Sequence, residues 1–293
     1  RYLTQLGACY FKDTSLLAPG TELSRYALWH FGPIAARYTD TKVKIILPSV
    51  AYRKTGIAVL RSGNAYAALF ALKNGQAGAG GHSHDDKLGV EYSLGKINIL
   101  VDPGQGVYLS DFKKREFFRS IRNHSVLTVD GRDVNPIYPG YPWYVPDKAD
   151  AFIEHASPRK GEACGAHYGF RDVCGDVPYR RTIKLQKDGT LSIHDEVPGG
   201  GVHLLTWRFV LAPHLQASLK EKESIIIVSQ EGNPCVSLRY PCEMNLTVAI
   251  HRGFYAPEYG LQIDTRVILL ETKTTLPAAC DFVFYPLTER TFY

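Results

Sequence analysis

Short runs of β-branched and aromatic residues recur along most of the chain and constrain its fold more than any other feature. They begin after residue 45, and segments rich in Gly, Pro, Asn and Asp separate them. The runs lie at 56–61, 66–72, 88–94, 97–101, 126–129, 182–185, 191–194, 204–211, 224–228, 235–240, 246–251, 265–271 and 281–285. In several of them apolar and polar residues alternate, as in Thr182 to Leu185, which gives a strand one buried and one wet face. This pattern predicts a mainly β fold, an antiparallel multi-stranded β-sandwich (supersandwich).

The N-terminal segment has a different pattern. Residues 20–37 look helical in pieces, with Ser24 or Thr21 as the N-cap and Gly32-Pro33 as a break. Little else looks helical. We therefore expect residues 1–45 to be a linker or the end of an N-terminal helical domain, and residues 46–293 to form the β-sandwich domain.

Composition and length indicate a folded globular chain. Its 293 residues are 45% hydrophobic and 22% charged, which is enough apolar material for one large core or two modest ones. The longest apolar runs fall far short of the roughly 20 residues that a membrane helix needs. The chain begins with Arg1, has a single methionine at Met244 and lacks a secretion pattern, so we expect a processed or truncated chain.

The charge balance is mildly basic, with a net charge of +5 and a pI near 8.8, which suits an anionic partner. Five basic residues cluster within ten positions: Lys113, Lys114, Arg115, Arg119 and Arg122. Two interpretations of this cluster stay open, an anion-binding patch and a solvated loop face. We expect neither nucleic acid nor a membrane as a partner, and the oligomeric state stays open.

The six cysteines form no CxxC pair, so a thiolate zinc knuckle or a thioredoxin-like motif has no support. Cys164 with Cys174, and Cys235 with Cys242, are close enough to close short loops by disulfides. Buried free thiols are at least as compatible with a chain of this length.

Residues 131–146 contain too many prolines for a central strand, and we expect a structured surface loop. Four aromatic residues lie in it: Tyr138, Tyr141, Trp143 and Tyr144. Aromatic side chains beside a polar cleft can stack on sugar rings. We expect the alternative, in which the loop packs down on its own aromatic side chains.

The segment Gly81-His82-Ser83-His84-Asp85-Asp86 is the strongest candidate for chemistry. If it is extended, its period-two geometry points His82, His84 and Asp86 to the same side. Burying three ionisable groups is costly without partners, so a metal, a cleft or a hydrogen-bond network is needed. The preceding residues 75–81, rich in Gly and Ala, leave room for a ligand.

Two more polar residues stand at the ends of apolar runs: Asp102 follows 97–101, and His124 precedes 126–129. Two imidazoles with a carboxylate suit zinc, with a fourth position left for water or another group. Isolated histidines are expected to be structural: His155, His167, His194, His203 and His214.

Five blocks in order resemble the heparinase II/III-like family: Gly81 to Leu88, Leu100 to Gly104, Arg115 to Ser120, Asn123 to Val126, and Val129 to Gly131. The similarity spans about Ser49 to Arg132. Members of that family join an N-terminal α/α toroid to a C-terminal antiparallel β-sandwich and cleave uronate-containing polysaccharides by β-elimination. The resemblance therefore implies a polysaccharide lyase, of which this chain carries the sandwich half.

The resemblance also implies roles for individual residues. His84, Asp102 and His124 match the family's zinc ligands, so Zn²⁺ is the expected cofactor, and His82 matches a position that faces the active-site cleft. The reaction needs neutralisation of the uronate carboxylate, a general base and an acid, often tyrosine. We take His82 as the candidate base or neutraliser. The expected substrate-binding residues are Arg119, Arg115 and Tyr108, with Tyr108 also a candidate acid.

The sequence departs from the family pattern at two positions. Phe117 replaces the first residue of the family's Tyr-Phe-Arg-Ser, and Ser125 replaces an asparagine. A tyrosine acid from that block is therefore absent, and the expected partner is the missing toroid, with its asparagine or histidine and its tyrosine. Two other functions stay open: a non-catalytic carbohydrate-binding sandwich with a structural zinc, and a metal-dependent hydrolase or oxygenase. A periplasmic or secreted location is expected.

Overall fold

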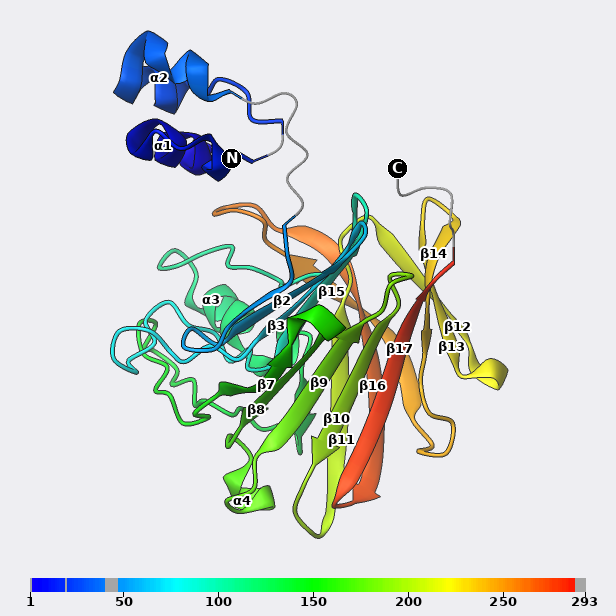
Figure 1. The fold of residues 1–293 in the computed structure, drawn as a ribbon. Helices are drawn as coiled ribbons and strands as arrows, with labels where there is room; N and C mark the ends of the chain where they lie inside the picture. The colour runs from blue at the N-terminus through cyan, green and yellow to red at the C-terminus, as the bar shows by residue number, and fades with distance from the viewer. Residues whose placement is uncertain (1, 19, 40–46, 288–293) are drawn as a thin grey trace. The chain divides into compact units, whose positions relative to one another are not determined.

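In the computed structural model the chain divides into two units, Arg1–Pro48 and Ser49–Tyr293. The structure describes residues 2–18, 20–39 and 47–287 (Figure 1). The predicted domain boundary between residues 45 and 46 lies in the segment 40–46, outside the described residues.

The first unit is helical. Its elements are α1 (Tyr2–Phe11), η1 (Thr14–Leu16), α2 (Arg25–Phe31) and η2 (Gly32–Tyr38). Ser24 caps α2, because its Oγ accepts a hydrogen bond from the Ala27 backbone N–H, and Gly32 ends α2 with φ of 61°. The predicted Ser24 cap and the break at Gly32-Pro33 are thus confirmed, while α1 was not predicted. None of the helices among the described residues is long and apolar enough to cross a membrane.

The second unit is built from three antiparallel sheets. One has five strands in sequence order: β1 (Val50–Tyr52), β2 (Ile57–Ser62), β3 (Ala65–Phe70), β4 (Gly89–Leu94) and β5 (Ile97–Leu100). The largest has eight in the order β12 (Leu215–Lys220), β13 (Ile225–Gln230), β14 (Asn233–Arg239), β17 (Ala278–Pro286), β10 (Leu191–Val197), β9 (Tyr179–Leu185), β8 (Glu162–His167) and β7 (Phe152–Ser157). The third has four in the order β15 (Thr247–Tyr255), β16 (Ile263–Thr275), β11 (Val202–Val210) and β6 (Leu127–Val129). Short helices interrupt the strands: α3 (Phe112–Arg119), η3 (Ile121–Asn123), η4 (Pro158–Lys160), α4 (Arg171–Cys174) and η5 (Glu221–Glu223).

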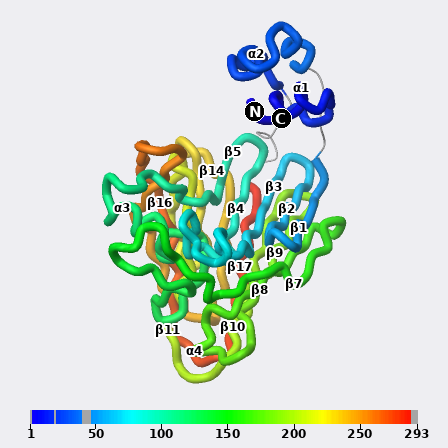
Figure 2. The backbone as a smooth tube through the Cα atoms, turned by 90° about the vertical axis from the view of Figure 1, so that its left-hand side faces the viewer, coloured from blue at the N-terminus to red at the C-terminus, as the bar shows by residue number. Residues whose placement is uncertain are grey.

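The three sheets make two layers, as the sandwich prediction required. The five-stranded sheet packs on the β7–β9 end of the eight-stranded sheet, and the four-stranded sheet packs near β12 (Figures 1 and 2). The two smaller sheets are joined edge to edge, because the Val101 N–H donates to the Val210 carbonyl at 3.0 Å. One continuous core fills the space between the layers, and Tyr92 and Trp207 both contact phenylalanine rings of β17 in it. The predicted fold class is confirmed.

Each predicted run overlaps a strand, but four strands were missed, namely β1, β7, β8 and β12. β8 shows the physical reason. It reads Glu-Ala-Cys-Gly-Ala-His, with little β-branched or aromatic content, because the layers approach closely here. A Cβ on Gly165 would lie 2.6 Å from Leu88 Cδ2, so the position needs glycine, and packing overrides strand propensity.

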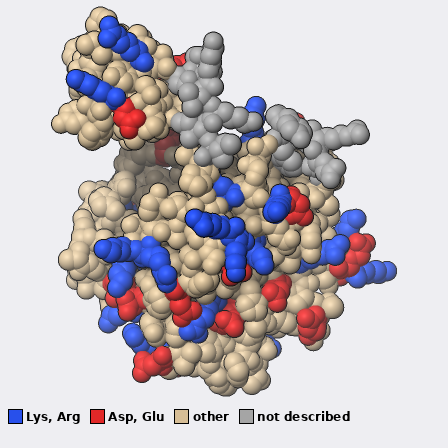
Figure 3. Space-filling view, viewed as in Figure 1, with Lys and Arg blue, Asp and Glu red and all other residues tan. Residues whose placement is uncertain are grey.

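Charges on the outer face of the eight-stranded sheet are paired across strands. The pairs are Arg180 with Glu154, Lys184 with Glu162, and His194 with Asp281. On the side of the molecule in Figure 3, basic and acidic side chains are interspersed. This face therefore offers no patch of one sign for an anionic polymer. The six cysteines are all unpaired, and five of them are buried.

His167, at the end of β8, makes the stability depend on pH. It is 1% exposed, its Nδ1 accepts from the Gly169 N–H at 3.0 Å, and burial, followed by the charges of Lys87 and Arg181, lowers its pKa to about 3. Between this value and the ordinary 6.5 the unfolded state binds the proton and the folded state does not, so stability falls as pH falls. We expect His167 alone to cost about 2 kcal/mol on going from neutral pH to about pH 5.

Urea unfolding at both pH values checks this. His167→Gln, which keeps a hydrogen-bond acceptor but does not titrate, should lose less stability than the wild type over that interval. The exposed His155 supplies the control, and His155→Gln should behave as the wild type does. Equal pH dependence in the wild type and His167→Gln would contradict the assignment.

Candidate functional site

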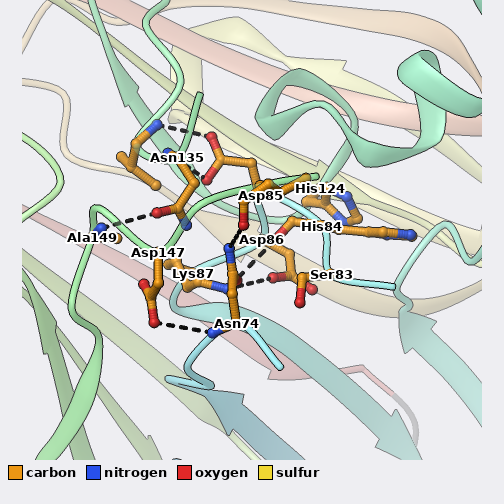
Figure 4. Close-up of polar contacts among 12 residues, drawn as sticks. Asn74, Ser83, His84, Asp85, Asp86, Lys87, His124, Asn135, Asp147 and Ala149 are labelled. Atoms are coloured by element: carbon orange, nitrogen blue, oxygen red, sulfur yellow. Dashed lines mark hydrogen bonds and ion pairs between the residues drawn. The ribbon is translucent and has the colours of Figure 1, made fainter. Parts of the chain in front are cut away.

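Two histidines and an aspartate come together beside α3. One ligand atom each from His84, Asp86 and His124 lies within 4.8 Å of the others, and the two imidazole ring centroids are 5.3 Å apart (Figure 4). His84 and Asp86 come from the connection between β3 and β4, and His124 from the turn before β6. Groups 40 residues apart in the chain thus share one small volume, which is the arrangement a metal site needs.

The backbone of the β3–β4 connection turns rather than running as a strand. Asp85 is fully buried and accepts hydrogen bonds from the Val134 and Asn135 N–H groups at 2.8 and 2.9 Å. It points away from the His84 and Asp86 side chains (Figure 4). The predicted shared side therefore holds for His84 and Asp86, whereas His82 has other neighbours.

Asp102 orients His124. Its Oδ2 lies 2.8 Å from His124 Nδ1, and His124 Nε2 lies 2.9 Å from the Phe118 carbonyl oxygen. Burial alone would lower the pKa of His124, but the Asp102 carboxylate outweighs it and the pKa is raised. Burial likewise opposes ionisation of Asp102, yet His124 and His84 bring the pKa of Asp102 down to about 2. Asp102, together with the Phe118 carbonyl on the other ring nitrogen, thus favours the protonated form of His124.

His84 is the neutral member of the cluster. Burial, and then the charge on His124, lower the pKa of His84 to about 4, so its imidazole carries a free lone pair at neutral pH. A histidine whose second nitrogen is held by a carboxylate, as His124 is by Asp102, is typical of metal sites. The donor set therefore fits a divalent transition metal. The structure places Asp86 among the clustered ligand atoms and Asp102 behind His124.

His82 lies among aromatic rings. It is exposed, and its ring centroid is 5.7 Å from that of Tyr108 and 5.2 Å from that of Trp143. Arg115 contributes a positive charge here, with its Cζ 4.7 Å from the Tyr108 centroid and 4.4 Å from the Trp143 centroid. His82, two positions along the chain from His84, thus contacts Tyr108.

Arg115 and Arg119 differ from the expectation of exposed, substrate-binding guanidinium groups. Both are 1% exposed. Arg115 donates to the Pro142 and Gly81 carbonyls at 2.7 and 2.9 Å, and Arg119 donates to Pro142 and Tyr144 at 2.9 and 3.0 Å. The helical phase of α3 explains this, because positions 115, 118 and 119 fall on its inward face. The basic cluster is thus divided, since Lys113, Lys114 and Arg122 are exposed.

The aromatic loop, residues 131–146, is held by these polar contacts to buried arginines. It contains no strand, as predicted. The expected packing on its own aromatics is found in part, because Tyr138 and Tyr144 stack with ring centroids 5.9 Å apart. The exposed fractions are nevertheless 44%, 65%, 42% and 43% for Tyr138, Tyr141, Trp143 and Tyr144. Buried donors and acceptors fix the backbone that carries these rings.

Sequence reasoning missed Arg181, which supports the centre from the core. Its Nη1 donates to the Leu88 carbonyl at 3.1 Å and to the Ser125 carbonyl at 2.9 Å. These carbonyls follow the two segments that carry Asp86 and His124. A signal was present in the sequence: strand alternation puts Arg181 on the face of Ile183 and Leu185, where a charge is unexpected.

Comparison with known proteins agrees with this geometry. The family model described as heparinase II/III-like, C-terminal, matches residues 47–282. A structure of the heparan sulfate lyase HepC mutant from Pedobacter heparinus superposes with a TM-score of 0.73 at 16% identity, covering 97% of this chain and 41% of that one. A structure of heparinase III gives 0.67 at 14% identity, covering 96% and 42%. These identities show a shared fold, and the chain spans under half the length of those proteins. No curated protein matches the sequence.

The family model covers most of the chain, including every segment that builds the cluster around His84 and His124. The chain therefore belongs to the heparinase II/III-like family and carries its C-terminal domain.

Proposed function

We propose that this protein is the sandwich part of a polysaccharide lyase that cleaves uronate-containing polysaccharides by β-elimination. One observation carries the proposal: exposed His82 stands two positions before His84 of the metal cluster, with its ring against Tyr108. The fold shared with a heparan sulfate lyase supports an acidic polysaccharide as substrate. The remaining parts of the cleft would come from an N-terminal α/α toroid, which we propose as the partner domain.

The reaction assigns roles to the residues in reach. A base removes the proton from the carbon beside the uronate carboxylate, the bond to the neighbouring sugar oxygen breaks, and an acid protonates that oxygen. A double bond remains in the new sugar end. His82 acts as the base or neutralises the carboxylate, and the Tyr108 hydroxyl is the acid that this chain offers. Arg115 and Arg119 act indirectly, because their hydrogen bonds to the Pro142 carbonyl fix the loop against which the sugar lies.

We propose zinc as the metal, held by His84 and His124 with Asp86 or Asp102 as the carboxylate. When bound, it would supply positive charge and hold together the segments that carry these residues. To offer Nε2 to a metal, His124 would have to lose the Nε2 proton and, with it, the hydrogen bond to the Phe118 carbonyl. The contact between Asp102 and Nδ1 would keep the His124 imidazole oriented toward the metal.

Removal of the His82 imidazole should reduce kcat by at least about 100-fold with heparan sulfate or another uronate polymer, because proton transfer loses its positioned group. Formation of unsaturated uronate, followed by ultraviolet absorbance with the full-length protein, measures this in His82→Ala. Metal content should stay at the wild-type value. The neighbouring Ser83→Ala is the control. Full activity of His82→Ala would refute the role, and the absence of product from every uronate polymer tested with the wild type would refute the lyase.

A carbohydrate-binding sandwich without catalysis is the second candidate, favoured by the exposed aromatics of residues 131–146. It predicts binding of uronate oligosaccharides with no unsaturated product.

We also propose a periplasmic or secreted location, because polysaccharides of this kind lie outside cells, and cell fractionation tests it.

A further inference from the structure

We propose that Trp143, Tyr108 and Tyr259 form one stacking surface for successive rings of an acidic sugar chain, which leads away from His82. We call these three side chains the aromatic row. For its ligand class the inference rests on the proposed function, and it adds Tyr259, for which the sequence predicted no role, and joins it with Tyr108 and Trp143 in one surface.

The geometry of the row suits sugar rings. The centroid of the Tyr108 ring lies 5.6 Å from that of Trp143, with 12° between the ring planes. It lies 6.0 Å from the centroid of Tyr259, with 16° between the planes. Near-parallel rings at this separation are offset, so each covers only part of its neighbour's face, and Arg115 lies against the Tyr108 and Trp143 rings. Tyr259 is 63% exposed and Trp143 is 42% exposed. The apolar C–H face of a pyranose packs on such a surface.

Backbone hydrogen bonds on both sides of Tyr259 fix its position. It lies in the loop between β15 and β16, which is fastened to the loop after Asp102 on both sides of the tyrosine. The Ala256 N–H donates to the Pro103 carbonyl at 2.8 Å, and the Gly260 N–H donates to the Gly106 carbonyl at 2.8 Å. Gly104 is required for this approach, because a Cβ there would lie 2.2 Å from the Ala256 oxygen. Tyr259 therefore keeps its position relative to Tyr108.

Trp143 is fixed in the same way from the opposite side. Both buried arginines of α3 bind the Pro142 carbonyl, and the Val145 N–H donates to the Ala79 carbonyl at 2.8 Å. Asn74 Nδ2 donates to the Val145 carbonyl at 2.7 Å. Since the backbone is already ordered, a ligand does not have to order it, and more of the contact free energy appears as affinity.

The charge beside the row favours an acidic ligand over a neutral one. The Arg115 guanidinium lies against the Tyr108 and Trp143 rings and has no carboxylate partner among the described residues. Its Nη1 is buried without a hydrogen-bond partner. Lys113 and Lys114, on the same helix, are exposed. A uronate or sulfate beside the rings would lie in the electrostatic field of the buried, uncompensated Arg115 charge, without a direct hydrogen bond to it.

Calorimetric binding to the full-length protein tests the row, with a heparan sulfate oligosaccharide and a neutral cello-oligosaccharide of equal length as probes. Trp143→Ala and Tyr259→Ala should each raise the Kd for the acidic probe at least about tenfold, as loss of a ring-stacking contact does. Tyr141→Ala is the control, because Tyr141 lies outside the row, in the same loop as Trp143, and at 65% is about as exposed as Tyr259. Its Kd should stay within about twofold of the wild type.

The outcomes separate the row from the lyase. If both row variants bind as the wild type does, if Tyr141→Ala weakens binding equally, or if the wild type binds neither probe, the row is refuted. Tighter binding of the neutral probe refutes its acidic ligand. If binding depends on Trp143 and Tyr259 while the wild type forms no unsaturated product, the row holds and the lyase proposal fails. If product forms and the row variants keep the wild-type Kd and KM, the lyase holds and the row fails.

Discussion

His84→Ala is expected to lose its stoichiometric zinc, whereas the wild type, dialysed after zinc loading, retains about one equivalent. His84 is the neutral imidazole of the cluster, with a pKa lowered to about 4, and His124 is the other histidine that belongs to it among the described residues. His124→Ala should have the same effect. Elemental analysis and the zinc-induced rise in Tm measure the loss without any activity assay.

The two aspartates make this experiment discriminating. The clustered geometry predicts that Asp86→Ala loses the metal, while Asp102→Ala, which removes the group that orients His124, binds it about 10–100-fold more weakly. The family resemblance predicts the reverse order, with Asp102 as the ligand. His155→Ala, at an exposed histidine outside the cluster, should keep the metal. Retention of one equivalent in His84→Ala would refute the centre itself.

Much of the fold could be predicted because strand signals are local. Alternation and turn residues identified most strands of the three sheets, including β9 and β10. β8 could not be found this way, because close contact with the facing layer, and not strand propensity, requires its small residues. α3 was missed for a related reason. Its cap, Asp111 accepting from the Lys114 N–H at 3.0 Å, precedes a run of charges that resembles a solvated loop.

The residues that come together could be named from the sequence, but their arrangement could not be predicted. His84, Asp102 and His124 lie close together because the β3–β4 connection, the segment after β5 and the turn before β6 meet. The choice between Asp86 and Asp102 depends on backbone turns that a period-two reading of the motif ignores. The burial of Arg115 and Arg119 depends on a partner loop more than 20 residues away in the chain. Such tertiary hydrogen bonds leave no local pattern.

The largest loss of stability is expected from Asp195→Ala. The Asp195 carboxylate, fully buried on β10, accepts four hydrogen bonds: Arg181 Nε at 2.8 Å, Arg181 Nη2 at 2.7 Å, the Tyr179 hydroxyl at 2.8 Å and Trp207 Nε1 at 2.8 Å. Alanine would leave the buried Arg181 charge uncompensated, which costs about 3–5 kcal/mol. The free energy of unfolding from urea titration measures this.

The neighbouring residue on β9 provides a matched control. Arg180 pairs with Glu154 through two hydrogen bonds of 2.8 Å, but both side chains are about a third exposed, so Glu154→Ala should cost less than about 1 kcal/mol. If the buried charge is the cause, Arg181→Met combined with Asp195→Leu should be more stable than Asp195→Ala, because no unpaired charge remains.

Arg181 also holds the Leu88 and Ser125 carbonyls, so the double variant should still bind zinc more weakly than the wild type. Equal losses in Asp195→Ala and Glu154→Ala would show that this core network contributes no more than a surface ion pair, and normal zinc affinity in the double variant would separate it from the metal centre.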